Sequence, residues 1–231
     1  MPVPSKGEEL LVKLPWVYRF GGAGFEGLFS SRHLVVDDLF PGSPKQLLKQ
    51  VHSAIVLTLD APLPTLPEAD GLLTTSKDFT LVVKTADCVP VLAYNPRVPF
   101  VAALHAGWRG IQGGIFPSFF HKALSIASRQ DLTGSTRFWI GPSICGRCYT
   151  VGEELVPLFS EAGFPESLFS RNGKGLVLDL HLAVRFALRE LGFSPSSMEE
   201  VPLCTLEDSR LFSYRRGERE GRLHHGIRLL P

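Results

Sequence analysis

Three short apolar runs place the strongest constraint on the fold of this chain. Phe79–Val83, Val89–Tyr94 and Phe100–Leu104 are rich in β-branched and aromatic residues and have the length of buried strands. Short segments containing Thr85-Ala86-Asp87 and Asn95-Pro96-Arg97 separate the runs. The pattern predicts three strands of a β-sheet within about a tenth of the chain.

Other strands are predicted later in the sequence. Arg137–Ile140 is a short β-prone run that ends at Gly141-Pro142. Weaker strand candidates, the last of them a closing edge strand, are Leu176–Leu178, Met198–Thr205 and Ile227–Leu230. The N-terminal third is predicted to be rich in loops.

Helices are predicted between the strands. Apolar residues recur at helical spacing in Gly113–Ala127, and Pro117 is tolerable there only in the first turn. A second apolar stripe runs through Leu180–Leu191, with Asp179 as its cap and Gly192 as its stop. Ser43-Pro44 predicts the start of a short helix that continues through Lys49.

Together these elements predict an α+β protein. The 231 residues are 44% hydrophobic, enough for a sizeable core. No internal repeat or long linker divides the sequence. We therefore expect one mixed α/β domain over residues 1–231, with a β-sheet core flanked by helices.

Composition excludes several classes of protein. Lys plus Arg total 24 against 23 Asp plus Glu, and this net charge of +1 argues against a nucleic-acid binder. Met1–Trp16 lacks the apolar core of a signal peptide. Charged residues interrupt Leu81–Trp108, the longest apolar stretch, so no membrane span is expected. Four cysteines without an export signal predict a cytoplasmic protein in a reducing compartment.

Three potential metal ligands lie at or near the predicted strand ends. Cys88 follows the first run, His105 follows the third, and His52 ends an upstream Gln50-Val51-His52. Two imidazoles and one thiolate suit zinc, with a fourth position left for water or substrate. Alone, Cys88 is more typical of a small core residue and His52 of a structural histidine. The combination predicts an enzyme with an open metal site.

The neighbours of these ligands strengthen the prediction. Asp87 precedes Cys88 at a strand end, where a carboxylate needs a partner or a place beside a metal. In the stretch after His105, small residues permit a sharp turn and close backbone approach. Trp108 and Arg109 add an aromatic face and a fixed cation.

Two further features leave alternatives open. Cys145-x-x-Cys148 is compatible with a structural zinc, which would need a second pair beyond the remaining Cys204, or with a redox pair. Two ordinary thiols in a loop are the favoured interpretation. The basic stretch with Arg215 and Arg216 is either a solvated loop or an anion clamp.

The order of motifs along the chain resembles that of a known family. The matching motifs are Gln50-Val51-His52, Ala69-Asp70-Gly71, Thr85-Ala86-Asp87-Cys88, His105-Ala106-Gly107-Trp108-Arg109-Gly110, Ile140-Gly141-Pro142 and Cys204-Thr205 through Phe212-Ser213-Tyr214-Arg215-Arg216. They resemble the laccase-domain proteins, named multicopper polyphenol oxidases and later purine nucleoside phosphorylases. The resemblance covers roughly residues 15 to 231.

This resemblance implies a fold, a cofactor and an activity. The fold is related to that of cysteine hydrolases. Zinc, with copper as the alternative ion, is held by His52, Cys88 and His105. The substrates are purine nucleosides and phosphate: adenosine, inosine and methylthioadenosine undergo phosphorolysis, and adenosine is also deaminated. A homodimer is expected by analogy.

The metal and the cations suggest a role for each further side chain in this chemistry. Arg109, Arg215 and Arg216 hold phosphate by charge and hydrogen bonds. Tyr149 either stacks on a planar substrate or packs against its neighbours, and Asp87 handles a proton or orients a ligand. For deamination, zinc activates a water molecule for attack on the purine.

Three alternatives use the same residues differently. In the first alternative, the protein is an amidohydrolase that acts on cell-wall precursors, with Cys88 as the nucleophile and His105 as the base. A copper-dependent polyphenol oxidase is less favoured, since seven histidines with two in site-like motifs are too few for several copper centres. A non-enzymatic binding module would leave the open coordination position without a purpose.

Overall fold

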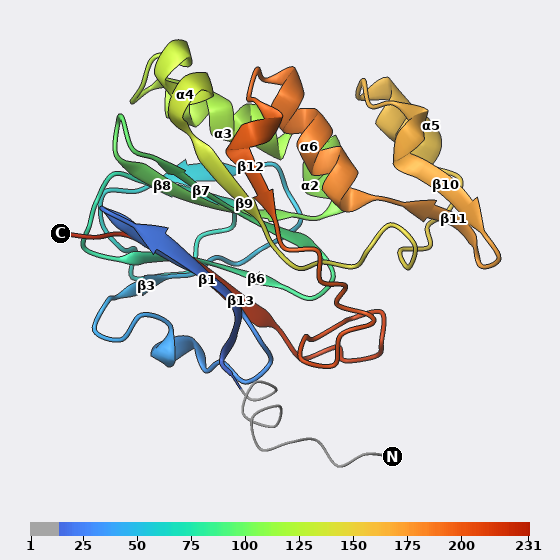
Figure 1. Ribbon diagram of the computed structural model, residues 1–231, viewed down its shortest axis with the longest axis horizontal. Coiled ribbons are helices and arrows are strands. Elements are labelled where there is room, and N and C mark those ends of the chain that lie inside the picture. The colour runs from blue at the N-terminus through green and yellow to red at the C-terminus, as the bar shows by residue number, and fades with distance from the viewer. Residues whose placement is uncertain (1–13) are drawn as a thin grey trace.

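Two β-sheets stacked face to face, with helices over the outer face of one of them, form the protein. The computed structural model describes residues 14–231. Most of Met1–Trp16, where the sequence predicts no signal peptide, therefore lies outside the described residues. In Figure 1 the helices lie above a six-stranded sheet, and a five-stranded sheet lies below it.

The five-stranded sheet joins the two ends of the chain. Its strands, in spatial order, are β1 (Trp16–Gly22), β2 (Phe25–Ser30), β13 (Leu223–Leu229), β6 (Thr80–Thr85) and β3 (Lys45–Gln46). All neighbours are antiparallel except β3 and β6, which are parallel.

The six-stranded sheet contains most of the strands predicted from the sequence. Its spatial order is β12 (Met198–Glu200), β9 (Arg137–Ile140), β7 (Val89–Asn95), β8 (Phe100–Ala106), β5 (Gly71–Thr74) and β4 (Val56–Thr58). The β12–β9 and β4–β5 pairs are parallel, and the central pairs are antiparallel.

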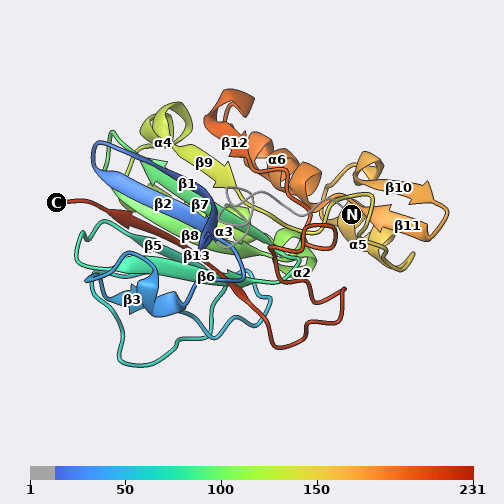
Figure 2. The same ribbon diagram turned by 60° about the horizontal axis from the view of Figure 1, so that its bottom comes forward.

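Helices and a small hairpin complete the fold. The helices are α2 (Trp108–Gln112), α3 (Ile115–Leu124), α4 (Arg129–Ser135), α5 (Leu155–Glu161) and α6 (Leu180–Glu190). Single 3-10 turns occur at Val36–Asp38, Glu166–Leu168 and Pro195–Ser197. The hairpin of β10 (Phe169–Asn172) and β11 (Gly175–Leu178) lies with α5 at the end away from the C-terminus, as Figure 1 and Figure 2 show.

Strands β7 and β8 are buried on both faces, which explains their continuous apolar sequence. One face packs against the helices through residues such as Val91, Ala102 and Leu104. The other face packs against the five-stranded sheet through residues such as Leu92 and Ala103. Side chains alternate along a strand, so each position in the sequence selects one of two cores.

Several predicted elements are confirmed. Strands β6, β7, β8, β9 and β11 coincide with the predicted runs. Helix α6 begins after Asp179, whose carboxylate accepts the Leu182 N–H at 2.9 Å, and it ends before Gly192 at φ +97°. Helix α3 places Pro117 in its first turn, as required.

Other predictions are wrong, and tertiary pairing explains why. The segment after Ser43-Pro44 is strand β3 rather than a helix, because it pairs with β6 and the Pro44 carbonyl accepts the Thr80 N–H at 2.8 Å. Strand β13 lies inside its sheet between β2 and β6, so it is not an edge strand. The N-terminal third contains the β1–β2 hairpin, and Met198–Thr205 is a strand only over its first three residues.

No helix among the described residues is long and apolar enough to cross a membrane.

A buried histidine of β13 connects this strand to both of its neighbours, β2 and β6. His225 in β13 is fully buried; its Nδ1 accepts the Ser30 N–H at 3.3 Å, and its Nε2 lies 2.8 Å from the Thr85 hydroxyl. Because Nδ1 accepts, the proton lies on Nε2 and is donated to Thr85. Burial, together with the neighbouring His224 and His105, lowers the pKa of His225 to about 3.

We predict that His225 makes folding stability depend on pH. The pKa of about 3 in the folded protein lies below the ordinary value for histidine of about 6.5, so the unfolded chain binds a proton first as pH falls. The stabilisation is present above about pH 6.5 and is lost toward lower pH, at up to about 1.4 kcal/mol per pH unit. Urea unfolding between about pH 7 and about pH 5 should show a steeper rise of stability with pH in the wild type than in His225→Gln. His121→Gln, a change at an exposed histidine, should keep the wild-type slope; equal slopes in all three proteins would contradict the prediction.

Candidate metal and active site

The structure brings His52, Cys88 and His105 together at one end of the space between the sheets. Their nearest ligand atoms lie within 4.8 Å of one another. In the β7–β8 register, Pro90 pairs with His105 and Val89 with Ala106. Alternation therefore puts Cys88 and His105 on the same face of this sheet, where it meets the other sheet.

A buried carboxylate, Asp70, organises this group. Its Oδ1 lies 2.7 Å from His105 Nδ1, which leaves His105 Nε2 for a metal or substrate. The same carboxylate accepts the backbone N–H groups of Val51, His52 and Ser53 at 3.3, 3.1 and 2.6 Å. Asp70 thus orients one imidazole directly and holds the loop that presents the other.

The loop before β4 is also tied to the opposite sheet. The Gln50 side chain donates to the Lys84 carbonyl at 2.7 Å and accepts the Lys84 N–H at 2.8 Å. The Gln50 amide thus supplies the two hydrogen bonds that a neighbouring strand would otherwise make to Lys84 of β6. His52 follows with φ +58°, an uncommon conformation for a side-chain-bearing residue, which the Asp70 hydrogen bonds stabilise.

Charges within the group are strongly coupled. Burial disfavours the Cys88 thiolate, but His105 and His52 outweigh it and lower the pKa of Cys88 to about 6. Burial likewise acts against a charged His105, yet Cys88 and Asp70 raise its pKa to about 9. Although burial opposes it, hydrogen bonds from His105 and Ser53 lower the pKa of Asp70 to about 2. The site therefore favours a positive charge between a thiolate and a carboxylate.

Gly107 leaves room for the three side chains. A Cβ atom at this position would lie 2.9 Å from Cys88 Sγ and 3.2 Å from His52 Cδ2. The backbone of Gly107 therefore forms one wall against the thiol, and a larger residue would push Cys88 or His52 away.

The hydrogen bonds of Asp87 join the turn after β6 to the C-terminal loop. It lies between β6 and β7 at φ +90°, and its carboxylate accepts the Thr205 hydroxyl at 2.6 Å and the Arg215 N–H at 2.8 Å. Its carbonyl also accepts the Ile144 N–H at 3.0 Å. Asp87 thus holds the C-terminal loop in place, while Asp70 contacts His105.

A cleft of about 640 Å³ opens over the three potential ligands. Its lining is strongly basic, with five cationic side chains and the single carboxylate of Asp87. The cationic residues are Lys49, Lys84, Arg109, Arg215 and Arg222. Such a lining attracts anions.

Three of the predicted binding residues line the cleft. The Arg109 guanidinium lies over the Trp108 ring at 4.4 Å, and no hydrogen bond from it to another described residue is found. The Arg215 guanidinium lies over the Tyr149 ring at 4.8 Å and donates to the Thr150 carbonyl at 2.9 Å. Burial raises the pKa of Tyr149 to about 12, so its hydroxyl keeps its proton.

The structure does not bring Arg216 into the cleft. Its guanidinium donates to the carbonyls of Thr205, Leu206 and Asp208 and forms an ion pair with Glu218 at 2.7 Å. These contacts hold the C-terminal loop together. The sequence could not show that Arg215 rather than Arg216 lines the cleft, because the two are consecutive residues in one polar segment.

Sequence reasoning missed Asp70 as a site residue, and it missed the basic lining from Lys49 and Lys84. Asp70 carried a usable signal, since a carboxylate directly before an apolar strand is costly to bury without partners. The two lysines carried no such signal, because lysine is common on any surface.

The sequence matches the multi-copper polyphenol oxidoreductase laccase family over residues 30–230. The chain belongs to this family, as its motifs indicated. It is 35% identical to a purine nucleoside phosphorylase of Streptomyces coelicolor over 76% of this chain and 71% of the relative. It is also 35% identical to a purine nucleoside phosphorylase of Mycobacterium tuberculosis, over 79% of this chain and 71% of the relative.

Two further comparisons bear on activity and fold. The chain is 33% identical to an adenosine deaminase of an unknown prokaryotic organism, over 74% of this chain and 66% of that protein. Its fold is similar to a crystal structure of a Neisseria meningitidis protein, with a TM-score of 0.81 and 25% identity, over 94% of this chain and all of the other.

We predict that Asp70→Asn destabilises the protein. An amide can replace one acceptor, but its NH2 group would face donors from the loop and His105. The free energy of unfolding should fall by about 2 to 4 kcal/mol, as measured by urea denaturation of the metal-free protein. The control Asp78→Asn, at an exposed turn, should stay within about 0.5 kcal/mol of the wild type. An Asp70→Asn protein as stable as this control would show that the carboxylate does not organise the site.

Proposed function

We propose that this protein is a zinc-dependent purine nucleoside phosphorylase with adenosine deaminase activity. The observation that carries the proposal is the group of His52, Cys88 and His105 at the base of a basic cleft. Relatives with 35% identity are named purine nucleoside phosphorylases, and one with 33% identity is named an adenosine deaminase.

The three side chains fit zinc in donor type and arrangement. Two imidazoles and a thiolate are ligands that zinc accepts, and Asp70 orients His105 as a metal-ligand partner commonly does. The site already stabilises a cation, in the form of the His105 proton, and a metal ion would take that place. When bound with an open coordination position, zinc supplies a Lewis acid that activates water near neutral pH. The same donors also accept copper.

Phosphate binding is assigned to the basic side of the cleft. Arg109 has its guanidinium available, and Arg215 is fixed by Asp87 and Thr150. Their positive charge holds the phosphate against the ribose carbon as the glycosidic bond breaks. The phosphate oxygen forms the new bond to that carbon, and the purine leaves with the electron pair of the broken bond and takes up a proton. This reaction requires positioning and charge stabilisation more than covalent catalysis.

Tyr149 is assigned to the purine. Arg215 stacks on one face of its ring, and its hydroxyl stays protonated because burial raises the pKa of Tyr149. The hydroxyl can therefore donate a hydrogen bond to a purine nitrogen. Asp87 acts by positioning Arg215 through its backbone N–H.

Product analysis tests the proposed function directly. The zinc-loaded protein is incubated with adenosine, inosine or methylthioadenosine, with and without phosphate. We expect free base and the sugar 1-phosphate only when phosphate is present, and inosine from adenosine in both conditions. Stoichiometric zinc without either product would contradict the proposal.

We predict that Arg109→Met weakens phosphate binding. Removing a charged donor should raise the KM for phosphate about tenfold or more in steady-state phosphorolysis. Arg137→Met, which removes an exposed arginine of β9 away from the cleft, is the matched control and should leave this KM unchanged. An unchanged KM in Arg109→Met would remove Arg109 from the phosphate site.

A second function is supported by the contacts of Cys88. A thiolate beside an imidazolium that is held by a buried carboxylate is the arrangement of a cysteine hydrolase. In that reaction Cys88 attacks the amide carbonyl of a cell-wall precursor, His105 gives its proton to the leaving amine, and water then hydrolyses the thioester.

The two proposed functions differ in whether they require a metal ion. We predict that chelation abolishes phosphorolysis and deamination, and that added zinc restores them. The amidase instead forms an acyl adduct on Cys88 in the presence of chelator, which mass spectrometry of the intact protein detects. Hydrolysis without metal that is lost in Cys88→Ser would favour the amidase; the absence of any adduct and of hydrolysis excludes it.

A further inference from the structure

A second group of metal-binding side chains lies outside the candidate active site. Strands β9 and β12 are parallel, and the segments that follow them stay side by side, with Ser143 and Cys204 in a β-bridge. Cys145-x-x-Cys148 follows β9, and Cys204-x-x-Glu207 follows β12. Parallel pairing therefore brings two pairs with the same spacing close together.

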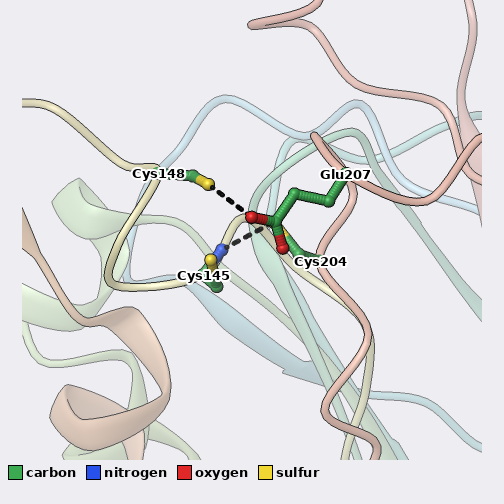
Figure 3. Close-up of side chains that lie close together, drawn as sticks. All are labelled: Cys145, Cys148, Cys204 and Glu207. Carbon is green, nitrogen blue, oxygen red and sulfur yellow. Dashed lines mark hydrogen bonds between the residues drawn. The ribbon is translucent and has the colours of Figure 1, made fainter.

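Their ligand atoms converge. One ligand atom from each of the four residues lies within 4.8 Å of the other three. The Cys148 thiol and the Glu207 carboxylate point toward each other from the two segments (Figure 3), with Cys148 Sγ donating to Oε1 at 3.4 Å. Cys204 is buried, Cys145 and Cys148 are partly buried, and Glu207 faces solvent.

The backbone around Cys204 suits a thiolate. The Cys145 N–H donates to Cys204 Sγ at 3.3 Å. Burial raises the pKa of Cys204, whereas the backbone N–H groups of Cys145, Glu207 and Leu206 act in the opposite direction. N–H groups directed at a sulfur stabilise it once it has lost its proton.

The four side chains have little cationic compensation from the described residues that contact them. Arg147 contacts Glu207 at 3.4 Å but is largely exposed. Burial and the neighbouring Cys145 and Glu207 raise the pKa of Cys148 to about 12, because a thiolate here would meet other negative groups. A divalent cation at the centre would remove this repulsion.

We propose that Cys145, Cys148, Cys204 and Glu207 bind a zinc ion in a closed, structural site. Paired ligands separated by two residues are typical of structural zinc sites, and three thiolates with one carboxylate complete a tetrahedron. Tetrahedral zinc with Zn–S bonds of about 2.3 Å has its sulfur atoms about 3.8 Å apart, so small side-chain movements suffice from the observed spacing. Binding releases the three thiol protons to solvent.

The ion cross-links the segment that carries Tyr149 of the cleft to the segment that contacts Asp87. Tyr149 directly follows Cys148, and Thr205 directly follows Cys204 and donates to Asp87 at 2.6 Å. Ile144, before Cys145, donates its N–H to the Asp87 carbonyl. The ion thus keeps Tyr149 and the loop of Arg215 in register with Asp87. The proposal stands apart from the proposed activity, since it uses none of the three ligands at the cleft.

Zinc content of the purified full chain tests the proposal. We expect Cys148→Ser to bind one zinc ion fewer than the wild type by elemental analysis, and Cys88→Ser to retain the ion that Cys148→Ser loses. The comparison holds even if the cleft binds no zinc. If Cys148→Ser binds as much zinc as the wild type, the proposal is wrong.

Cobalt absorption identifies the ligands even if a variant is unstable. In Cys88→Ser the cleft has no thiolate, so thiolate-to-cobalt charge transfer in the near ultraviolet can come only from the second group. We expect this absorption in Cys88→Ser and its loss in Cys88→Ser combined with Cys145→Ser. Its absence from folded Cys88→Ser, or a mass two hydrogens lower that shows a disulfide within the group, overturns the proposal.

The fourth ligand has a matched control. Glu207 and Glu153 are both exposed and each pairs with an exposed arginine. We expect Glu207→Gln to lower zinc affinity at this site about tenfold or more and Glu153→Gln to leave it unchanged. Zinc removal should lower the Tm of the wild type by about 5 °C or more, with a smaller shift in Cys148→Ser. Equal affinities in the two glutamate variants exclude Glu207 as a ligand.

Discussion

The buried carboxylate of Asp70 is the interaction on which the candidate active site depends. It accepts three successive backbone N–H groups from the loop before β4 and contacts Nδ1 of His105 in β8. A carboxylate with this many donors stays ionised although it is buried, and its charge supports the imidazolium of His105. That imidazolium in turn stabilises the Cys88 thiolate. One side chain therefore positions both imidazoles and, through His105, favours the thiolate of Cys88.

A second carboxylate, Asp87, connects the loops beside the cleft. Asp87 contacts neither imidazole; it joins the turn between β6 and β7 to the C-terminal loop through Thr205 and the Arg215 backbone. Beside it, the segments after β9 and β12 run together and gather three thiols and a carboxylate. Asp70 thus holds the loop of His52, and Asp87 holds the loop of Arg215. The chemistry proposed for the cleft needs such rigidity, since phosphorolysis depends on positioning.

Local patterns predicted the elements whose formation is decided locally. The stripe and caps of α6 and the apolar runs of β7 and β8 were readable because their periodicity and boundaries lie within each segment. Strand β3 was mistaken for a helix because Ser43-Pro44 is a good local helix start, and only pairing with β6 makes the segment extended. Strand β13 likewise lies in the middle of its sheet because it pairs with β2 and β6, which are far away in sequence.

The residue types of the site could be read from the sequence: a thiol and an imidazole at the ends of buried strands, a second imidazole upstream, and motifs in the order of one family. The folded structure was needed to show which carboxylate contacts His105, which of two consecutive arginines lines the cleft, and that Glu207 lies with the three cysteines. The reason is physical. Strand alternation fixes which face a side chain occupies, but sheet order and loop packing, set by contacts between distant segments, fix what that face meets.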